Sequence, residues 1–149
     1  MTYLKFGWRV FVVGIFIALV ILIGDRSSVL LFKDVFERLR PNHNPMLEDA
    51  LHYVNGSGGA GKFGFVSSHA TNSFALAVFS SLLLKSKFKF IVAAMLFWAV
   101  LVSYSRVYVG VHFPADLLGG ALLGTLVGVF VFWLMKMANQ KFNLKLKEL

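Results

Sequence analysis

Residues 117–135 read LLGGALLGTLVGVFVFWLM and contain no charged side chain. A helix needs about 20 predominantly apolar residues to cross the hydrocarbon core of a bilayer, so this stretch predicts a membrane-spanning helix. Three further apolar blocks precede it, at Val10–Gly24, Ala70–Leu84 and Phe90–Tyr104. These blocks are shorter, and they cross a membrane only if their helices extend into the polar residues at their ends. We therefore expect an all-α, integral-membrane helical bundle with about four spans.

The overall composition favours this membrane class over a soluble one. Of the 149 residues, 58% are hydrophobic, whereas a soluble domain has about 45–50% apolar residues. None of the four blocks shows the polar face at helical spacing that a surface helix of a soluble bundle would have. The chain has no cysteine, which excludes a disulfide framework and thiolate metal sites.

Basic residues gather on one predicted side of the membrane. With a cytoplasmic N-terminus, the inner segments hold nine Lys and Arg residues and one acidic residue, and the outer segments hold six of each sign. Lys and Arg in short flanking segments favour the cytoplasmic side. We therefore expect both termini in the cytoplasm, in a bacterial cytoplasmic membrane. The net charge of +8 sits in short clusters beside apolar blocks, which argues against nucleic-acid binding.

The segment between the first two spans, Asp25 to His69, forms a long outer loop with no large apolar block. Within it, Phe32 to Leu39 is expected to form a short helix that ends at Arg40, because a residue before proline avoids helical geometry. No internal repeat or linker divides the chain, so we interpret residues 1–149 as a single membrane domain.

Lys33 and Arg40, followed by Pro41, form the first cluster of polar residues. Their spacing of seven places both side chains near one face of the expected short helix. Two cations there suit a phosphate dianion, and the arginine adds a bidentate fork. Taken alone this pattern is weak, since Lys and Arg on an exposed helix are usually a solvated face.

The second cluster, Ser67-Ser68-His69, directly precedes the second apolar block. The N-terminus of a helix presents free N–H groups and the positive end of the helix dipole to anions. Ser67 could cap this helix or donate to a phosphate, and His69 could act as a general acid at the membrane boundary. Taken alone, a helix cap beside a surface histidine is the simpler interpretation.

The third cluster comprises Ser105-Arg106, His112 and Asp116. Pro114 suits the first turn of the last helix, which puts Asp116 in that turn, where negative charge is favoured. His112 and Asp116 are four apart and can meet if this turn bends back. A carboxylate bonded to one imidazole nitrogen frees the other nitrogen to attack. The alternative is a structural His–Asp pair, although an ionisable group at a span boundary favours function.

A metal site is the competing interpretation of these residues, because histidines with an aspartate can bind zinc. However, Lys33, Arg40 and Arg106 lie on the same predicted side of the membrane and would repel a cation. They suit an oxyanion instead, so we expect neither a metal nor a cofactor.

Together these residues resemble the type 2 phosphatidic acid phosphatase superfamily, in its membrane lipid phosphatase branch. The three motifs of that family are K-x6-R-P, P-S-G-H and S-R-x5-H-x3-D, in this order. The first and third are matched in full, and the resemblance covers about Phe32 to Gly128. The second motif reads Val66-Ser67-Ser68-His69, so the family's Pro and Gly are replaced.

The resemblance implies a role for each matched residue. His112 would attack phosphorus and form a phosphohistidine, Asp116 would orient His112, and His69 would protonate the leaving lipid oxygen and then activate water. The residues implied to bind the phosphate are Lys33, Arg40, Ser67, Ser68 and Arg106. Of these, Ser68 would bind it through its backbone N–H.

The implied reaction is metal-independent hydrolysis of a phosphomonoester or diphosphate on a membrane lipid, at a site on the outer face. The lipid is left open: phosphatidate, phosphatidylglycerol phosphate, a polyprenyl diphosphate such as undecaprenyl diphosphate, or a lipid A phosphate. A haloperoxidase would use similar residues, but such relatives are generally soluble.

Membrane members of the family typically have six spans, with the first motif after the third span. Here the first motif follows the first span, so we expect two N-terminal spans to be missing. A minimal member, a fragment, a misassigned start and a truncated non-catalytic membrane subunit all stay open.

Gly120, Gly124 and Gly128 form a row of small residues on the last span. Such a row lets helices pack closely in lipid. We expect it to hold the third cluster against neighbouring helices, with an oligomer contact as the alternative.

Overall fold

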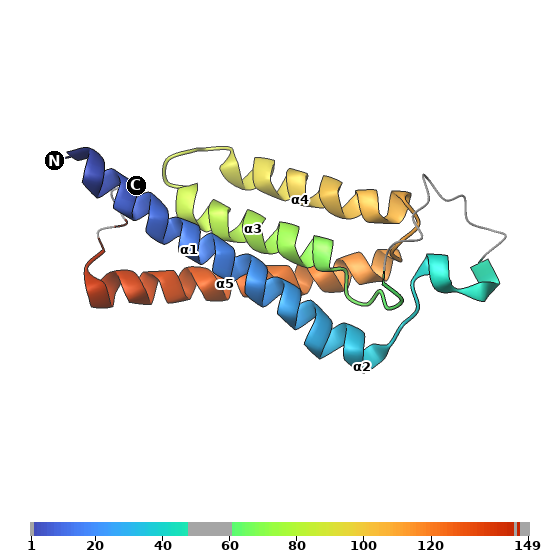
Figure 1. Cartoon of the computed structure of the whole chain (residues 1–149). Coiled ribbons are helices and arrows are strands. Elements are labelled where there is room, and N and C mark those ends of the chain that lie inside the picture. The colour runs from blue at the N-terminus through green and yellow to red at the C-terminus, as the bar shows by residue number, and fades with distance from the viewer. Residues whose placement is uncertain (1, 48–60, 145, 147–149) are drawn as a thin grey trace.

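Four long helices form the bundle of the computed structural model, which describes residues 2–47, 61–144 and 146. They are α1 (Thr2–Ser28), α3 (Ser68–Leu84), α4 (Ile91–Tyr108) and α5 (Pro114–Phe142) (Figure 1). Helix α3 begins at the same end of the bundle at which α1 and α4 finish and α5 starts. The N-terminal part of α1 and the last turns of α5 lie at the opposite end.

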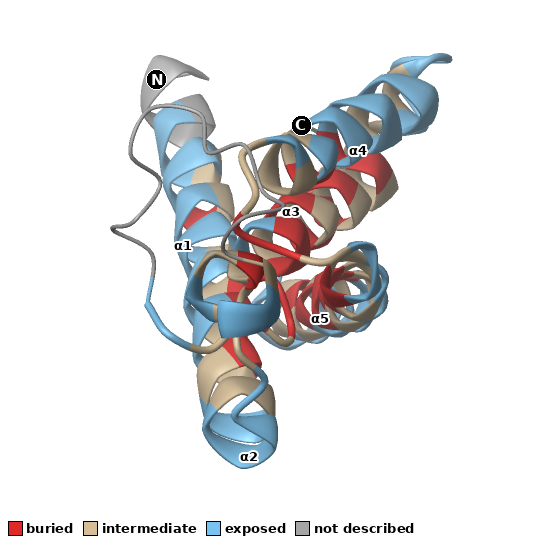
Figure 2. Ribbon diagram, turned by 90° about the vertical axis from the view of Figure 1, so that its right-hand side faces the viewer, coloured by how far each residue is buried: buried red, intermediate tan, exposed pale blue. Residues whose placement is uncertain are grey.

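Helix α3 lies at the centre and packs against α1, α4 and α5. Its sequence explains this position, because Ala70, Ser73, Ala75 and Ala77 are small and nearly inaccessible to solvent. Small side chains let neighbouring helices approach closely in a membrane. Figure 2 shows the consequence: buried residues concentrate on α3 and on the side of α5 that faces it, while the outer surfaces are exposed.

The glycine row of α5 lies directly on the backbone of α3. A Cβ atom added at Gly124 would come within 2.2 Å of the carbonyl oxygen of Thr71. Gly120 and Gly128 lie in the same way against the carbonyl oxygens of Ser67 and Ala75. The expected packing role of the row is therefore confirmed, and the alternative oligomer contact is not available there, because α3 already fills this face of α5.

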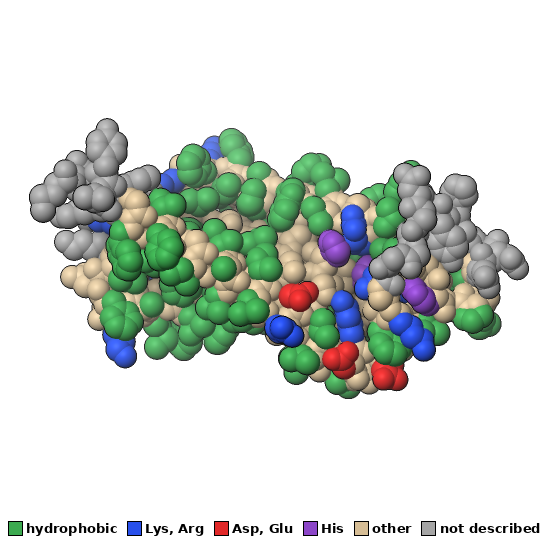
Figure 3. Space-filling view, in the orientation of Figure 1, with side chains coloured by type: hydrophobic (Ala, Val, Ile, Leu, Met, Phe, Trp, Pro, Cys, Tyr) green, Lys and Arg blue, Asp and Glu red, His purple; other side chains and the backbone are tan. Residues whose placement is uncertain are grey.

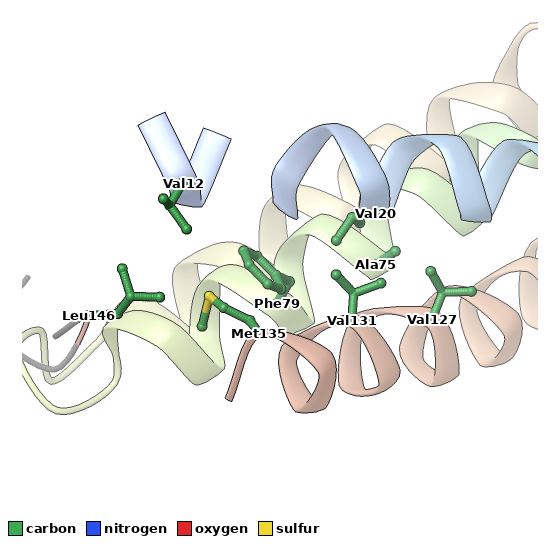
Figure 4. Close-up of a cluster of buried hydrophobic side chains, with 8 residues drawn as sticks. All are labelled: Val12, Val20, Ala75, Phe79, Val127, Val131, Met135 and Leu146. Atoms are coloured by element: carbon green, nitrogen blue, oxygen red, sulfur yellow. The ribbon is translucent and has the colours of Figure 1, made fainter. Parts of the chain in front are cut away.

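A cluster of apolar side chains fills the bundle toward the end where α5 finishes. It joins α1, α3 and α5 and contains the fully buried Phe79 and Val131 (Figure 4). The other members are Val12, Val20, Ala75, Val127, Met135 and Leu146.

The expected all-α, integral-membrane class with about four long helices is confirmed. In the described part of the chain, three segments are long and apolar enough to cross a membrane: Gly7–Phe36, Ile91–Tyr108 and Pro114–Phe142. Helix α3 has only 17 residues. It is slightly shorter than these three segments, and seven of its residues are buried.

The prediction of a separate short helix from Phe32 to Leu39 is wrong. Helix α1 instead continues into a π-helical turn (Val29–Lys33) and a single α-helical turn, α2 (Asp34–Phe36). Residues 25–36 contain no glycine or proline that would break the helix after the first apolar block. It stops at Glu37, whose backbone is left-handed with φ of 45°.

The loop between α2 and α3 is therefore shorter than the predicted loop from Asp25 to His69. It carries two 3-10 turns, Pro41–His43 and Pro45–Leu47. Residues 48–60 of this loop lie outside the described residues.

Candidate active site

The three polar clusters of the sequence meet at one end of the bundle. Lys33 ends the π-helical turn that follows α1, and Ser67 to His69 lie at the start of α3. His112 lies just before α5, and Asp116 lies in its first turn. Figure 3 shows histidine and charged side chains gathered over this half of the molecule. The lysines between α3 and α4 lie at the opposite end (Figure 1).

The first turn of α5 brings His112 and Asp116 together. Pro114 starts the helix, and the Asp116 side chain reaches back to accept the backbone N–H of Phe113 at 2.9 Å. The same carboxylate oxygen, Oδ2, lies 3.3 Å from Nδ1 of His112. Asp116 is fully buried and His112 is 3% exposed, so their contact is shielded from water.

Two partners select one tautomer of His112. A carboxylate only accepts hydrogen bonds, so Nδ1 must carry the proton that faces Asp116. The guanidinium NH1 of Arg40 lies 3.3 Å from Nε2. Arginine only donates, so Nε2 must present its lone pair. Both contacts require the Nδ1–H tautomer, which leaves the free lone pair on Nε2.

The surroundings of His112 also keep it neutral. Burial lowers its pKa below the ordinary value; the hydrogen bond that His112 donates to Asp116 opposes this shift, and the positive charge of Arg40 adds to it. The net direction is downward, so the imidazole holds its free lone pair near neutral pH.

Arg40 is held in place by a short pairing with the segment that precedes α3. Leu39 and Phe63 form an isolated antiparallel bridge. The N–H of Arg40 donates to the carbonyl of Lys62 at 3.1 Å, and its side-chain Nε donates to the carbonyl of Phe63 at 3.0 Å. Burial lowers the pKa of Arg40 and the charge of Asp116 opposes this, although an arginine stays protonated.

Gly64 leaves room for this arrangement. A Cβ atom there would lie 2.9 Å from Cγ of Arg40 and 3.3 Å from Oδ2 of Asp116. The backbone N–H of Gly64 also donates to the carbonyl of Arg38 at 2.9 Å. A larger residue would displace the arginine or the carboxylate, so the close approach requires glycine.

Arg38 is a member of the site that the sequence reasoning missed. Its NH1 lies 3.0 Å from Oδ1 of Asp116, the oxygen that His112 does not use. Its guanidinium also stacks over the Phe113 ring, 4.5 Å from the centroid. A usable signal was present: a residue before proline is extended, and alternate residues of an extended chain point to the same side, which puts Arg38 beside Arg40.

The second cluster begins with a helix cap. The Ser67 hydroxyl accepts the N–H of Ala70 at 3.4 Å, which is the capping geometry that the sequence suggested. The N–H of Ser67 donates to the carbonyl of Asp116 at 3.1 Å, so the second and third clusters are joined through their backbones. Ser67 is fully buried.

Lys33, His69 and Arg106 complete the set. The Lys33 ammonium donates to the Ser68 hydroxyl at 2.7 Å. His69 is exposed and lies close enough to Arg106 and His112 to interact with both electrostatically. Arg106 donates through Nε to the Ser105 hydroxyl at 3.1 Å. Every residue expected at the site therefore lies at this end of the bundle.

The arrangement suits an anion. Among the described residues, no three His, Asp or Glu side chains come together as a metal site would require. Arg38 and Arg40 instead contact the only two buried ionisable groups of the described chain, Asp116 and His112. A bound oxyanion beside His112 would find cations and a helix N-terminus around it.

Comparisons with known proteins agree with this chemistry. The sequence matches the PAP2 superfamily over residues 8–140. It is 43% identical over 124 residues to a lipid A 4'-phosphatase of Porphyromonas gingivalis, covering 82% of this chain and 50% of that protein. It is 37% identical over 149 residues to a lipid A 4'-phosphatase of Bacteroides thetaiotaomicron, covering 97% of this chain and 62% of that protein.

A solved structure has the same fold. It is a transmembrane PAP2 type phosphatidylglycerolphosphate phosphatase from Bacillus subtilis, with a TM-score of 0.65 and 29% sequence identity. The match covers 83% of this chain and 59% of that one. The chain thus spans between half and two thirds of the length of these relatives.

Proposed function

The chain belongs to the PAP2 superfamily, and from this premise we propose that it hydrolyses a phosphomonoester on a membrane lipid through a phosphohistidine. The observation that carries the proposal is the pair of contacts on His112, which leaves the lone pair of a neutral Nε2 directed at a cation. The two lipid A 4'-phosphatases among its relatives favour a lipid A phosphate as the substrate.

In the first step, the Nε2 lone pair of His112 attacks phosphorus, and an N–P bond forms while the bond from phosphorus to the lipid oxygen breaks. His69 donates a proton to that leaving oxygen. His112 then carries positive charge, which the Asp116 carboxylate stabilises through Nδ1–H. Arg40 must leave the Nε2 lone pair and turn to the phosphate as the substrate enters, because it covers this nitrogen in the empty site.

In the second step, water attacks the phosphohistidine and inorganic phosphate leaves. His69, now neutral, accepts the proton of that water, and the N–P bond breaks to restore neutral His112. Dividing the reaction into two displacements lowers each barrier. Phosphoryl transfer depends mainly on positioning and on stabilising charge, which matches a site with more cations than acids.

The phosphate oxygens would be bound by Lys33, Arg40, Arg106 and the start of α3. Ser67 uses an oxygen lone pair for its cap, so its hydroxyl proton remains to be donated. The N–H of Ser68 lies in the first turn of α3, where helix N–H groups have no partner within the helix.

A phosphate-release assay over lipid phosphates tests the proposal. His112→Ala should lower turnover by at least about 10³-fold, as expected when a covalent nucleophile is removed. His43→Ala, at an exposed histidine in the 3-10 turn, is the matched control and should retain activity. Substantial turnover by folded His112→Ala would exclude this nucleophile. Activity that excess chelator abolishes and divalent metal restores would favour a metal mechanism.

We also propose that both termini are cytoplasmic and that the site opens on the outer face. The lysine-rich turn between α3 and α4 lies at the opposite end of the bundle from His112 (Figure 1). Because the chain has no cysteine, single variants report location cleanly. In intact cells, an impermeant maleimide should label Lys62→Cys and not Ser86→Cys; the reverse pattern would invert the topology.

A further inference from the structure

A π-helical turn at the end of α1 changes which residues share a face. In an α-helix of 3.6 residues per turn, residues five apart lie about 140° apart around the axis. A π turn closes between residues five apart. The turn at Val29–Lys33 follows directly after Ser28, so Ser28 and Lys33 come to the same side of the helix. Both face the start of α3.

Ser68 on α3 receives both side chains. Its hydroxyl oxygen lies 2.7 Å from the Lys33 ammonium and 2.6 Å from the hydroxyl of Ser28. Ser28 in turn donates to the backbone carbonyl of Asp25 at 2.8 Å. Ser28 is fully buried, and Ser68 and Lys33 are half-buried.

The direction of each of these three hydrogen bonds is determined by the groups at its two ends. The carbonyl of Asp25 only accepts, so the Ser28 proton points to it and Ser28 must accept from Ser68. The ammonium of Lys33 only donates, so Ser68 accepts from it. The result is one continuous sequence of donors from Lys33 through Ser68 and Ser28 to Asp25. Hydrogen bonds in series polarise and strengthen one another.

We propose that Ser68 and Ser28 are positioning residues that hold the Lys33 ammonium where it meets the substrate phosphate. Ser68 stands where the family motif P-S-G-H has glycine, so in this chain the hydroxyl supplies a contact that a glycine cannot make. The inference deepens the proposed function, since it assumes that Lys33 binds a phosphate-like anion. It assigns the side chain of Ser68 to the lysine and leaves its N–H for the anion.

The test measures vanadate binding by calorimetry on the full chain in detergent, independently of turnover. Ser68→Ala and Ser68→Gly should each raise the Kd for vanadate about tenfold, which is about 1.4 kcal/mol. Ser28→Ala should raise it by a smaller factor, because Lys33 keeps its contact with Ser68. Ser68→Thr, which restores a hydroxyl, should recover most of the affinity.

A double-mutant cycle separates positioning from general structure. If Ser68 acts through Lys33, then Ser68→Ala should add nothing to the loss caused by Lys33→Ala. Ser80→Ala, the same change further along α3, is the control and should bind vanadate as the unaltered chain does. Circular dichroism and size-exclusion profiles confirm that the variants fold.

The outcomes distinguish the two proposals. Unchanged affinity in Ser68→Ala and Ser68→Gly, or additive losses in the cycle, would overturn the role of Ser68. Failure of the unaltered chain to bind vanadate would also overturn it. Vanadate binding with the expected losses, but without phosphate release from any lipid, would refute the proposed function and leave the role of Ser68 supported.

Discussion

Replacing Arg38 with glutamine tests how the Asp116 carboxylate behind His112 is held. Arg38 contacts Oδ1 of Asp116 at 3.0 Å, while Oδ2 accepts from His112 and from the Phe113 N–H. Glutamine keeps much of the length of the side chain but removes its charge and its stacking over Phe113. Asp116 then keeps two of its three donors, and one oxygen of a fully buried carboxylate loses its partner.

The size of the effect follows from burial. Removing one partner of a fully buried ion pair costs about 3–5 kcal/mol, whereas an exposed pair contributes about 0.2–1 kcal/mol. The Arg38 side chain is 42% exposed and Asp116 is fully buried, so the free energy of unfolding should fall by an intermediate amount, about 1–2 kcal/mol. A less firmly held carboxylate should also lower kcat/KM about tenfold, or about 1.4 kcal/mol.

The pH profile carries a separate signature. With Arg38 gone, one cation fewer competes for Asp116, and the carboxylate stabilises protonated His112 more strongly. The pKa of His112 should therefore rise, and the acid limb of kcat/KM should move to higher pH. Arg38→Lys keeps the charge without the planar fork, so the pH of its acid limb should fall between those of the unaltered chain and Arg38→Gln.

The assay is lipid phosphate release as a function of pH, together with thermal unfolding in detergent. Arg26→Gln removes an exposed arginine near the end of α1 and serves as the control. Arg38→Gln could match this control in kcat/KM, in the pH of the acid limb and in thermal stability. The contact between Arg38 and Asp116 would then contribute to neither catalysis nor stability, and the reasoning would be refuted.

Two further predictions concern the nucleophile and the packing. Because burial lowers the pKa of His112, the acid limb of kcat/KM should have its midpoint below about pH 6.5, the pKa of an unperturbed histidine. The free energy of unfolding should decline as pH falls through about 6.5, since the unfolded chain then binds a proton that the folded chain does not. An acid limb above 6.5 would contradict this. Gly124→Ala should destabilise the fold by about 1–3 kcal/mol through overpacking against Thr71. Gly14→Ala is the control, because nothing lies within 4 Å of its added Cβ, and it should stabilise the fold by up to about 1 kcal/mol. Equal melting temperatures for the two variants would argue against tight α3–α5 packing.

The sequence by itself was enough for the fold class and for most of the site. Backbone groups in a bilayer must be satisfied within their own segment, so long apolar runs can only be helices. The His112–Asp116 contact was likewise predictable, because a proline at the first position of α5 and a spacing of four are local features. Local geometry needs no knowledge of the rest of the chain.

The secondary structure predicted for the first cluster was wrong, because it did not follow from local features. It treated Lys33 and Arg40 as two residues on one short helix, but Lys33 belongs to the π-helical turn after α1 and Arg40 to an extended segment. No local signal marked the π turn after Ser28 or the left-handed stop at Glu37.

Only the tertiary structure decided which distant residues touch. Arg38 and Asp116 are 78 residues apart, Arg40 and His112 are 72 apart, and Lys33 and Ser68 are 35 apart. Each contact depends on the register in which one helix lies against another, to within a single turn. The sequence names the glycines of α5, but only packing shows that they rest on successive carbonyls of α3. That register places Asp116 beside Ser67, because two helices in contact can slide only in steps that their small and large side chains allow.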